Sequence, residues 1–185
     1  MADAVTAMHI RPLTRSDAAE FQALRLRALR DNPEAFGSTY AQEEHTPLET
    51  IAMRLGDGDD ASTNVVLGVA DEPNGPLHGL AGCYRESGVK QRHKAVIWGM
   101  YVAPEARGRG AGRRLLDAVI ARASRWPGLE QLSLSVVPEN VAARTLYVAR
   151  GFVPYAVEPR ALAQGGRYYD LEYLWLRLSE GGDKT

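Results

Sequence analysis

The hydrophobic positions of this chain switch repeatedly between the spacing of a strand and the spacing of a helix. Residues 132–136 alternate apolar side chains with serine, as in a half-buried strand, whereas Leu115, Leu116, Val119 and Ala123 recur as on one helix face. The pattern predicts strands at 5–13, 65–70, 77–85, 94–102, 132–136, 152–158 and 168–178, and helices at 17–30, 48–55, 110–125 and 140–150. Segment 34–44 fits neither spacing.

Local signals mark the ends of these elements. Asp17 and Glu20 have the spacing of a capping box, which places a helix start at Asp17. The turn residues at 73–76 join two strands, as in an antiparallel hairpin. Strand 94–102 is nearly all apolar, so we expect it to be buried on both faces.

The order of these elements predicts an α+β, or mixed α/β, domain built around one sheet. Neither repeats nor an internal linker divide the sequence. We therefore expect a single domain over residues 1–180, followed by a disordered tail at 181–185.

Composition narrows the class of protein. The chain has 185 residues, of which 45% are hydrophobic and 24% charged, as in an ordinary globular domain, and its formal net charge is -1. This balance predicts neither nucleic acid nor a membrane as a partner. Cys83 is the only cysteine, no Cys/His set has zinc spacing, and residues 1–7 do not resemble a signal peptide. We expect a cytoplasmic protein without a metal.

The segment 97–112 has the character of an anion-binding site. A buried strand leads through a Gly/Arg turn into a helix, whose first N–H groups lack intrahelical partners and carry partial positive charge. Glycines allow left-handed backbone angles and close approach of a phosphate. Arg107, Arg109, Arg113 and Arg114 add cations near the same turn.

Nucleotide fingerprints fit this turn poorly. A P-loop requires Lys-Ser/Thr after its second glycine, and a Rossmann turn requires G-x-G-x-x-G, whereas this chain has Gly108, Gly110 and Gly112. Arg107, Gly110 and Gly112 instead satisfy [Q/R]-x-x-G-x-[G/A], and the segment thereby resembles the pyrophosphate loop of the GNAT (GCN5-related) N-acetyltransferases.

A second segment carries the same resemblance. Residues 140–152, NVAARTLYVARGF, are similar to the N-x-x-A-x-x-L-Y-x-x-x-G-F helix of that superfamily and follow the first motif in the family's order. The resemblance covers nearly the whole chain. It implies the acyl-CoA N-acyltransferase fold: a mostly antiparallel, twisted sheet of about seven strands, with strands four and five splayed and about four flanking helices.

The resemblance also implies a cofactor site and a mechanism. Acetyl-CoA would be the co-substrate, its pantetheine arm lying against the fourth strand and its pyrophosphate against the turn. An amine would attack the thioester directly in a ternary complex, with Tyr147 as the general acid at the sulfur and a strand-four N–H facing the oxyanion. The positions that match the family's cofactor site are Tyr101, Val102, Ala103, Arg107, Gly108, Arg109, Gly110, Ala111, Gly112, Arg113, Asn140, Ala143 and Tyr147.

The residue that serves as general base in several family members has no counterpart in this chain. Several members have Glu on the fourth strand where this chain has Trp98, which cannot accept a proton and is expected to pack in the core or to line the acceptor site. A water relay is an equal alternative to the other candidates, which are His93, Glu43, Glu44, His45, Asp170 and Glu172.

The acceptor amine is left open by the sequence. Its contacts are expected from the N-terminal third and the last hairpin, at Phe36, Tyr40, Glu43, Glu44, Tyr168, Tyr169 and Asp170. Asn140 could equally cap its helix, and Tyr147 could equally be a core aromatic. A non-catalytic acyl-CoA-binding module with the same fold is the alternative function, and a homodimer is a family-level expectation.

Overall fold

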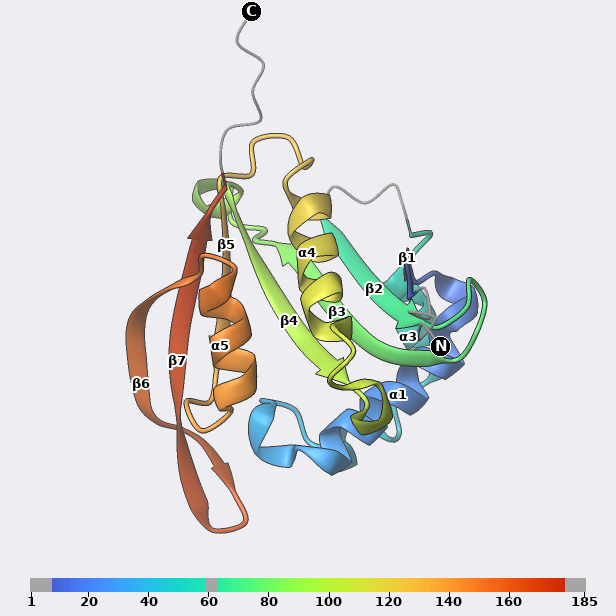
Figure 1. Ribbon diagram of the computed structural model, residues 1–185, viewed down its shortest axis with the longest axis horizontal. Helices are drawn as coiled ribbons and strands as arrows, with labels where there is room; N and C mark the ends of the chain where they lie inside the picture. Colours follow the sequence, from blue (N-terminus) through green and yellow to red (C-terminus); the bar gives the residue numbers. More distant parts are fainter. Residues whose placement is uncertain (1–7, 59–62, 179–185) are drawn as a thin grey trace, which may run out of the picture.

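A computed structural model describes residues 8–58 and 63–178 of the chain. Its strands form one seven-stranded sheet in the order β1-β2-β3-β4-β5-β7-β6 (Figure 1). All neighbouring strands are antiparallel except β4 and β5, which are parallel. The strands are β1 (His9–Pro12), β2 (Asn64–Ala70), β3 (Leu77–Arg85), β4 (Lys94–Val102), β5 (Gln131–Val136), β6 (Val153–Gln164) and β7 (Arg167–Arg177).

Helices cover both faces of the sheet. The α-helices are α1 (Ala18–Asp31), α2 (Tyr40–Glu43), α3 (Leu48–Leu55), α4 (Ala111–Ala123) and α5 (Val141–Ala149), and the short 3-10 helices are η1 (Arg15–Asp17), η2 (Pro33–Ala35), η3 (Val89–Gln91) and η4 (Pro104–Ala106). One core cluster packs α4 and α5 against β2, β3, β4, β5 and β7, and a second packs α1 and α3 against β2, β3 and β4. Figure 1 shows α4 and α5 on the same face of the sheet.

Most predicted elements are confirmed. The strands at 77–85 and 94–102 and the helix at 48–55 have the predicted bounds. Three differences stand out: segment 34–44 contains the short α2, β6 runs to Gln164, and β1 starts at His9. The predicted start of β1 at residues 5–7 and the tail at 181–185 lie outside the described residues.

The parallel pair β4 and β5 is short. Only Lys94, Ala95 and Val96 of β4 pair with residues 131–133 of β5. From Ile97 onward the two strands diverge, which confirms the predicted splay. The edge of β4 that faces β5 is therefore free to pair with another extended chain over its second half.

A β-bulge in β4 reverses the faces of its side chains. Gly82 of β3 pairs with Trp98, but Leu80, two residues back, pairs with Tyr101, so β4 contains one extra residue at Gly99–Met100. Gly99 has φ +65°, an angle that glycine adopts without strain. Before the bulge, Trp98 faces the α1 side of the sheet. After it, Tyr101 faces that side and Met100 packs with the α4 cluster.

The prediction that strand 94–102 is buried on both faces is wrong in part. Ala95, Ile97 and Tyr101 are buried, but Val96, Trp98 and Met100 are only half-buried. Helices cover the strand unevenly, and the splay removes its neighbour beyond Val96.

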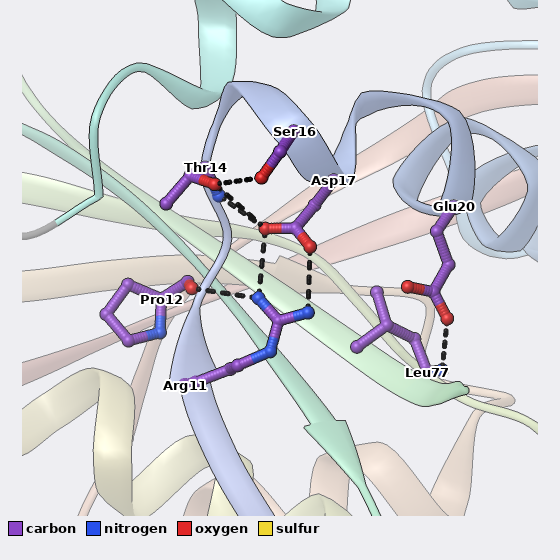
Figure 2. Close-up of polar contacts among 7 residues, drawn as sticks. All are labelled: Arg11, Pro12, Thr14, Ser16, Asp17, Glu20 and Leu77. Carbon is purple, nitrogen blue, oxygen red and sulfur yellow. Dashed lines mark hydrogen bonds and ion pairs between the residues drawn. The ribbon is translucent and has the colours of Figure 1, made fainter. Parts of the chain in front are cut away.

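The start of α1 is held by a different cap from the one predicted. The Asp17 carboxylate accepts the Thr14 N–H at 2.7 Å and two hydrogen bonds from the Arg11 guanidinium, at 2.9 and 2.7 Å (Figure 2). Glu20 does not close a box with Asp17; its carboxylate accepts the Leu77 N–H of β3 at 2.6 Å. The spacing identified the right region, but Glu20 links the helix to the sheet.

We expect Asp17→Asn to lower the free energy of unfolding by about 1–2 kcal/mol at pH 7, because it weakens a cap and an ion pair. Hydrogen bonds from Arg11 hold the pKa of Asp17 below its usual value. The stabilisation should thus be complete above about pH 4 and disappear as the pH falls through the lower folded-state pKa. Denaturant unfolding of both proteins at pH 7 and below pH 4 checks this.

Asp57→Asn serves as the control for that comparison. Asp57 pairs with Arg15 at 3.0 Å, but its side chain is 82% exposed, so its loss should change stability little at either pH. An Asp17→Asn difference that stays constant from pH 7 to pH 2 would contradict the assigned role of the ion pair.

Candidate active site

Tyr147 lies where β4 and β5 have separated. Its hydroxyl donates to the Met100 sulfur at 3.7 Å, and its ring meets Phe152 edge-on with 6.1 Å between centroids. Burial raises the pKa of Tyr147 to about 12, so the phenol stays protonated throughout the neutral range. The side chain is both a core aromatic, as the sequence allowed, and a hydrogen-bond donor facing β4.

The Gly/Arg turn immediately precedes the N-terminus of α4. Gly108 and Gly110 have φ values of +74° and +82°, and a Cβ at either position would meet no atom within 4 Å. The first three residues of α4 have N–H groups without intrahelical acceptors. The turn is therefore an open, backbone-lined surface at the positive end of a 13-residue helix, as an anion requires.

This turn lies beside the gap that contains Tyr147. A Cβ at Gly112, in the first turn of α4, would stand 3.6 Å from atoms of both Leu146 and Met100. The α4 N-terminus, the bulged part of β4 and α5 therefore meet at one place, although Leu146 of α5 lies 34 positions beyond Gly112 in the sequence.

The arginine side chains of the turn are mostly engaged with the protein. Arg107 donates to the Val102 carbonyl at 2.9 Å, and Arg109 forms a two-bond ion pair with Asp71. Arg113 is exposed and lies 3.8 Å from Asp117. Arg107 and Arg109 thus have protein partners within the described residues, and their predicted contact with an anion stays a prediction.

The remaining predicted cofactor positions do not all face this gap. Asn140 caps α5, and its side chain accepts the Ala143 N–H at 3.2 Å. Tyr101 points to the other face, where its hydroxyl donates to Asp31 at 2.7 Å. Val102 is the last residue of β4, and the next N–H, that of Ala103, is bonded to the His78 carbonyl of β3.

A cavity of about 320 Å³ lies on the opposite, α1 face of the sheet. Trp98 forms part of its wall, and its indole packs so closely on Gly82 that a Cβ there would overlap it. The other lining residues are Phe21, Arg25, Ser38, Glu43, Arg54, Asn64, Val66 and Tyr84. A wider groove of about 670 Å³ adjoins it at Tyr84. Trp98 packs against the α1-side core and also lines this cavity; its predicted role at the acceptor site stays a prediction.

Arg25 and Glu43 form a partly buried ion pair in that cavity. Arg25 donates to the Glu43 carboxylate through Nε at 3.2 Å and Nη2 at 2.9 Å, and its guanidinium lies 4.8 Å from the Phe36 ring centroid. Burial alone would raise the pKa of Glu43, but bonds from Arg25 and Ser38 and the charge of Arg54 hold it below its usual value.

The candidate bases have other partners or lie elsewhere. Glu43 is paired with Arg25, and Glu172 is buried in a two-bond pair with Arg144, at 2.6 and 3.1 Å. Asp170 accepts the Arg160 N–H at 2.7 Å. Glu44 and His45 are exposed and 3.7 Å apart, and His93 precedes β4, at the far end from Met100.

The predicted acceptor contacts separate into two groups. Phe36 and Glu43 surround Arg25, and Tyr40 lies under Arg30 with 4.8 Å to its ring centroid. The residues of the last hairpin, Tyr168, Tyr169 and Asp170, contact Arg160 and Arg167 and do not line the cavity.

Two important positions were missed by sequence reasoning, although each had a signal. Gly99 interrupts an apolar strand, which is a known mark of a bulge. Arg25 occupies the buried face of α1, one turn after Phe21 and one turn before Leu29, where the helical pattern calls for an apolar residue. A charged residue on such a face needs a buried partner, and Glu43 is that partner.

Neither a membrane span nor a metal site emerges from the described ranges 8–58 and 63–178. No helix there is long and apolar enough to cross a bilayer, and no group of three or more His, Cys, Asp or Glu side chains could hold a metal ion.

Known proteins resemble the chain in sequence and in fold. It is 30% identical over 112 residues to an L-amino acid N-acyltransferase, MnaT, of Escherichia coli; the match covers 60% of this chain and 64% of that protein. The chain thus spans just under two thirds of the length of this relative.

Solved structures share the fold over nearly the full length. A GNAT-family acetyltransferase of Streptococcus pneumoniae superposes with a TM-score of 0.83 at 21% identity, covering 94% of this chain and all of that one. A phosphinothricin acetyltransferase of Sinorhizobium meliloti, solved with acetyl-CoA, gives 0.78 at 18% identity, covering 96% and 92%.

The family assignment follows from a family model that matches well over half of the chain. Residues 17–152, which include the Gly/Arg turn, the splayed strands and the Tyr147 helix, match the Acetyltransferase (GNAT) family. The chain belongs to the GNAT acetyltransferase family.

Proposed function

We propose that this protein is an acetyl-CoA-dependent N-acetyltransferase that acts on the primary amine of a small molecule. The observation that carries the proposal is the convergence of the open glycine turn, the free β4 edge and the Tyr147 hydroxyl around one gap. Residues 108–113 would hold the pyrophosphate through backbone N–H groups, and residues 101–103 would border the pantetheine arm.

The roles of the residues follow from the chemistry of direct transfer. A neutral amine attacks the thioester carbonyl, the new C–N bond forms and the C–S bond breaks. Tyr147, kept protonated by burial, donates a proton or hydrogen bond to the leaving sulfur. A backbone N–H near the Gly99 bulge is placed to stabilise the carbonyl oxygen as it gains charge.

The proton released by the amine leaves through water in this proposal. The carboxylates of Glu43, Glu172 and Asp170 already accept hydrogen bonds from Arg25, Arg144 and Arg160. None of the three is therefore free to accept the proton of the amine. The alternative, a non-catalytic acyl-CoA-binding module, is less well supported because Tyr147 retains both its hydroxyl and its position at the gap.

A small-molecule acceptor is favoured over a protein by two observations. The cavity on the α1 face is about 320 Å³ and partly enclosed, which suits a compact ligand. The names of similar proteins also specify small acceptors, L-amino acids for MnaT and phosphinothricin for the Sinorhizobium enzyme.

The first prediction from this proposal concerns the glycine turn. Acetyl-CoA at 100 times its Kd should stabilise the protein by about 2.7 kcal/mol, visible as a rise in Tm, whereas ATP and NAD should not. Gly110→Val should abolish that rise, because a side chain would fill the open surface and φ +82° suits valine poorly.

Gly128→Val is the matched control for backbone strain. Gly128 has φ +69° and equally open surroundings, but it lies beyond the C-terminus of α4. It should lose comparable stability and keep the acetyl-CoA shift. No acetyl-CoA shift in the folded wild-type protein would refute the proposed function, and a full shift in Gly110→Val would refute the placement of the pyrophosphate.

The second prediction concerns Tyr147→Phe. Turnover should fall ~10² to 10⁴-fold with little change in acetyl-CoA affinity, since the hydroxyl acts on the leaving sulfur. Because the pKa of Tyr147 is about 12, wild-type activity should show no decline from tyrosine ionisation between pH 7 and pH 10. Tyr155→Phe, a substitution at an exposed tyrosine, is the control. Full activity of Tyr147→Phe would remove Tyr147 from the mechanism.

The proposal also includes that the protein forms a single domain over residues 1–180, is located in the cytoplasm and assembles as a homodimer. The lone Cys83 is a buried thiol, which fits a reducing compartment, and the edge strand β6 exposes Val153, Tyr155 and Val157. Sedimentation at micromolar concentration should give twice the chain mass; the mass of one chain would contradict the dimer.

A further inference from the structure

Arg25 is a buried guanidinium with an unused donor. The residue is only 6% exposed, yet its Nη1 atom, which no solvent reaches, has no hydrogen-bond partner among the described residues. Buried polar groups of this kind are nearly always paired, and an unpaired one costs stability. Arg25 also lines the cavity on the α1 face, so a ligand that enters this cavity would meet the Arg25 side chain.

The guanidinium is held in a fixed orientation. Glu43 binds its Nε and Nη2 edge through two bonds, and the Phe36 ring lies against its plane. The remaining edge, which carries Nη1, is left for a second planar acceptor. A carboxylate matches the geometry of such an edge better than a hydroxyl or a carbonyl does.

The charges of the cavity favour an anion. Arg25 and Arg54 are cationic and Glu43 is anionic, so its charged lining residues sum to one positive charge. One carboxylate would balance it. An ammonium group in this cavity would instead be repelled by Arg25 and Arg54, and the Glu43 carboxylate is already paired with Arg25.

The free donor lies next to the gap where transfer would occur. A Cβ at Gly99 would stand 3.8 Å from Arg25 Nη1, and the next residue, Met100, contacts Tyr147 on the other side of the sheet. The β4 bulge therefore lies between the two places. In an α-amino acid the amine and the carboxylate are attached to the same carbon, so one end could be held while the other is acetylated.

We propose that Arg25 binds the carboxylate of the acceptor, and that the acceptor is a small amine bearing a carboxylate beside the amine. Phe21, Val66 and Trp98 would contact its apolar side chain. The inference rests on the proposed function and names the substrate class of that site.

The test compares acceptors with the same side chain, with and without the carboxylate, and kcat/KM is calculated on the neutral amine because the carboxylate also changes the basicity of the amine. CoA release is measured with L-leucine against 3-methylbutylamine, L-methionine against 3-(methylthio)propylamine, and L-phenylalanine against phenethylamine. The wild-type kcat/KM should favour the carboxylate member of at least one pair by about 10- to 100-fold, as a charge-assisted pair provides. Equal or better use of the decarboxylated amines throughout would overturn the proposal.

Variants of Arg25 test whether this residue causes the preference for acceptors with a carboxylate. Arg25→Gln is combined with Glu43→Gln, so that no unpaired carboxylate is left buried. The preference should fall to near one in this double variant, while the acetyl-CoA shift in Tm is retained. Arg30→Gln, an exposed position on the same helix, should keep the preference. An unchanged preference in the folded double variant would overturn the proposal.

Two further measurements apply if the double variant does not fold or if none of the amines is acetylated. If the double variant does not fold, Arg25→Lys retains the charge but not the planar edge, and it should reduce the preference at least several-fold; an undiminished preference overturns the proposal. If no amine is turned over, calorimetry with the same three amino acids and the CoA-bound protein replaces kinetics, and absence of binding overturns it. The rise in Tm with acetyl-CoA is measured independently, and its absence in the wild-type protein would refute the proposed function rather than the role of Arg25.

Discussion

The separation of β4 from β5 is the constraint on which the rest of the site depends. Three residue pairs hold the strands together, and beyond Val96 no strand within residues 8–58 and 63–178 pairs with this edge of β4. An open edge inside a sheet is costly unless something pairs with its N–H and C=O groups. The chain places α5, the glycine turn and the N-terminus of α4 around that opening, so its backbone donors and the Tyr147 hydroxyl converge on one gap.

The bulge at Gly99 gives that opening two different sides. Because one extra residue reverses the alternation of β4, Met100 turns toward α5 and Tyr101 toward α1. The same few residues therefore border the Tyr147 hydroxyl on one face and the Arg25 guanidinium on the other. A regular strand would put Trp98, Met100 and Val102 on one face, and this division would be lost.

The sequence predicted features that depend on local spacing and missed those that depend on a distant partner. Helix 48–55 and the strands at 77–85 and 94–102 follow from periodicity, and Gly110 follows from a turn motif with a backbone requirement. Glu20 shows the limit: its spacing from Asp17 suggested a cap, but its partner is the Leu77 N–H of β3, 57 residues away. Arg25 is similar, since only the folded chain brings Glu43 and Gly99 to its guanidinium.

The tryptophan at position 98 can be understood together with Arg25. Both line the same cavity, and Gly82 makes room for the indole. A glutamate at position 98 would supply a base, but it would also place a carboxylate in the cavity of Arg25, where it would compete with the acceptor for the free Nη1. An enzyme that holds its acceptor by a carboxylate is better served by an uncharged side chain there, with the amine's proton passing to water. Under the proposed function, the tryptophan at position 98 and the unpaired Arg25 donor would both follow from a single class of acceptor.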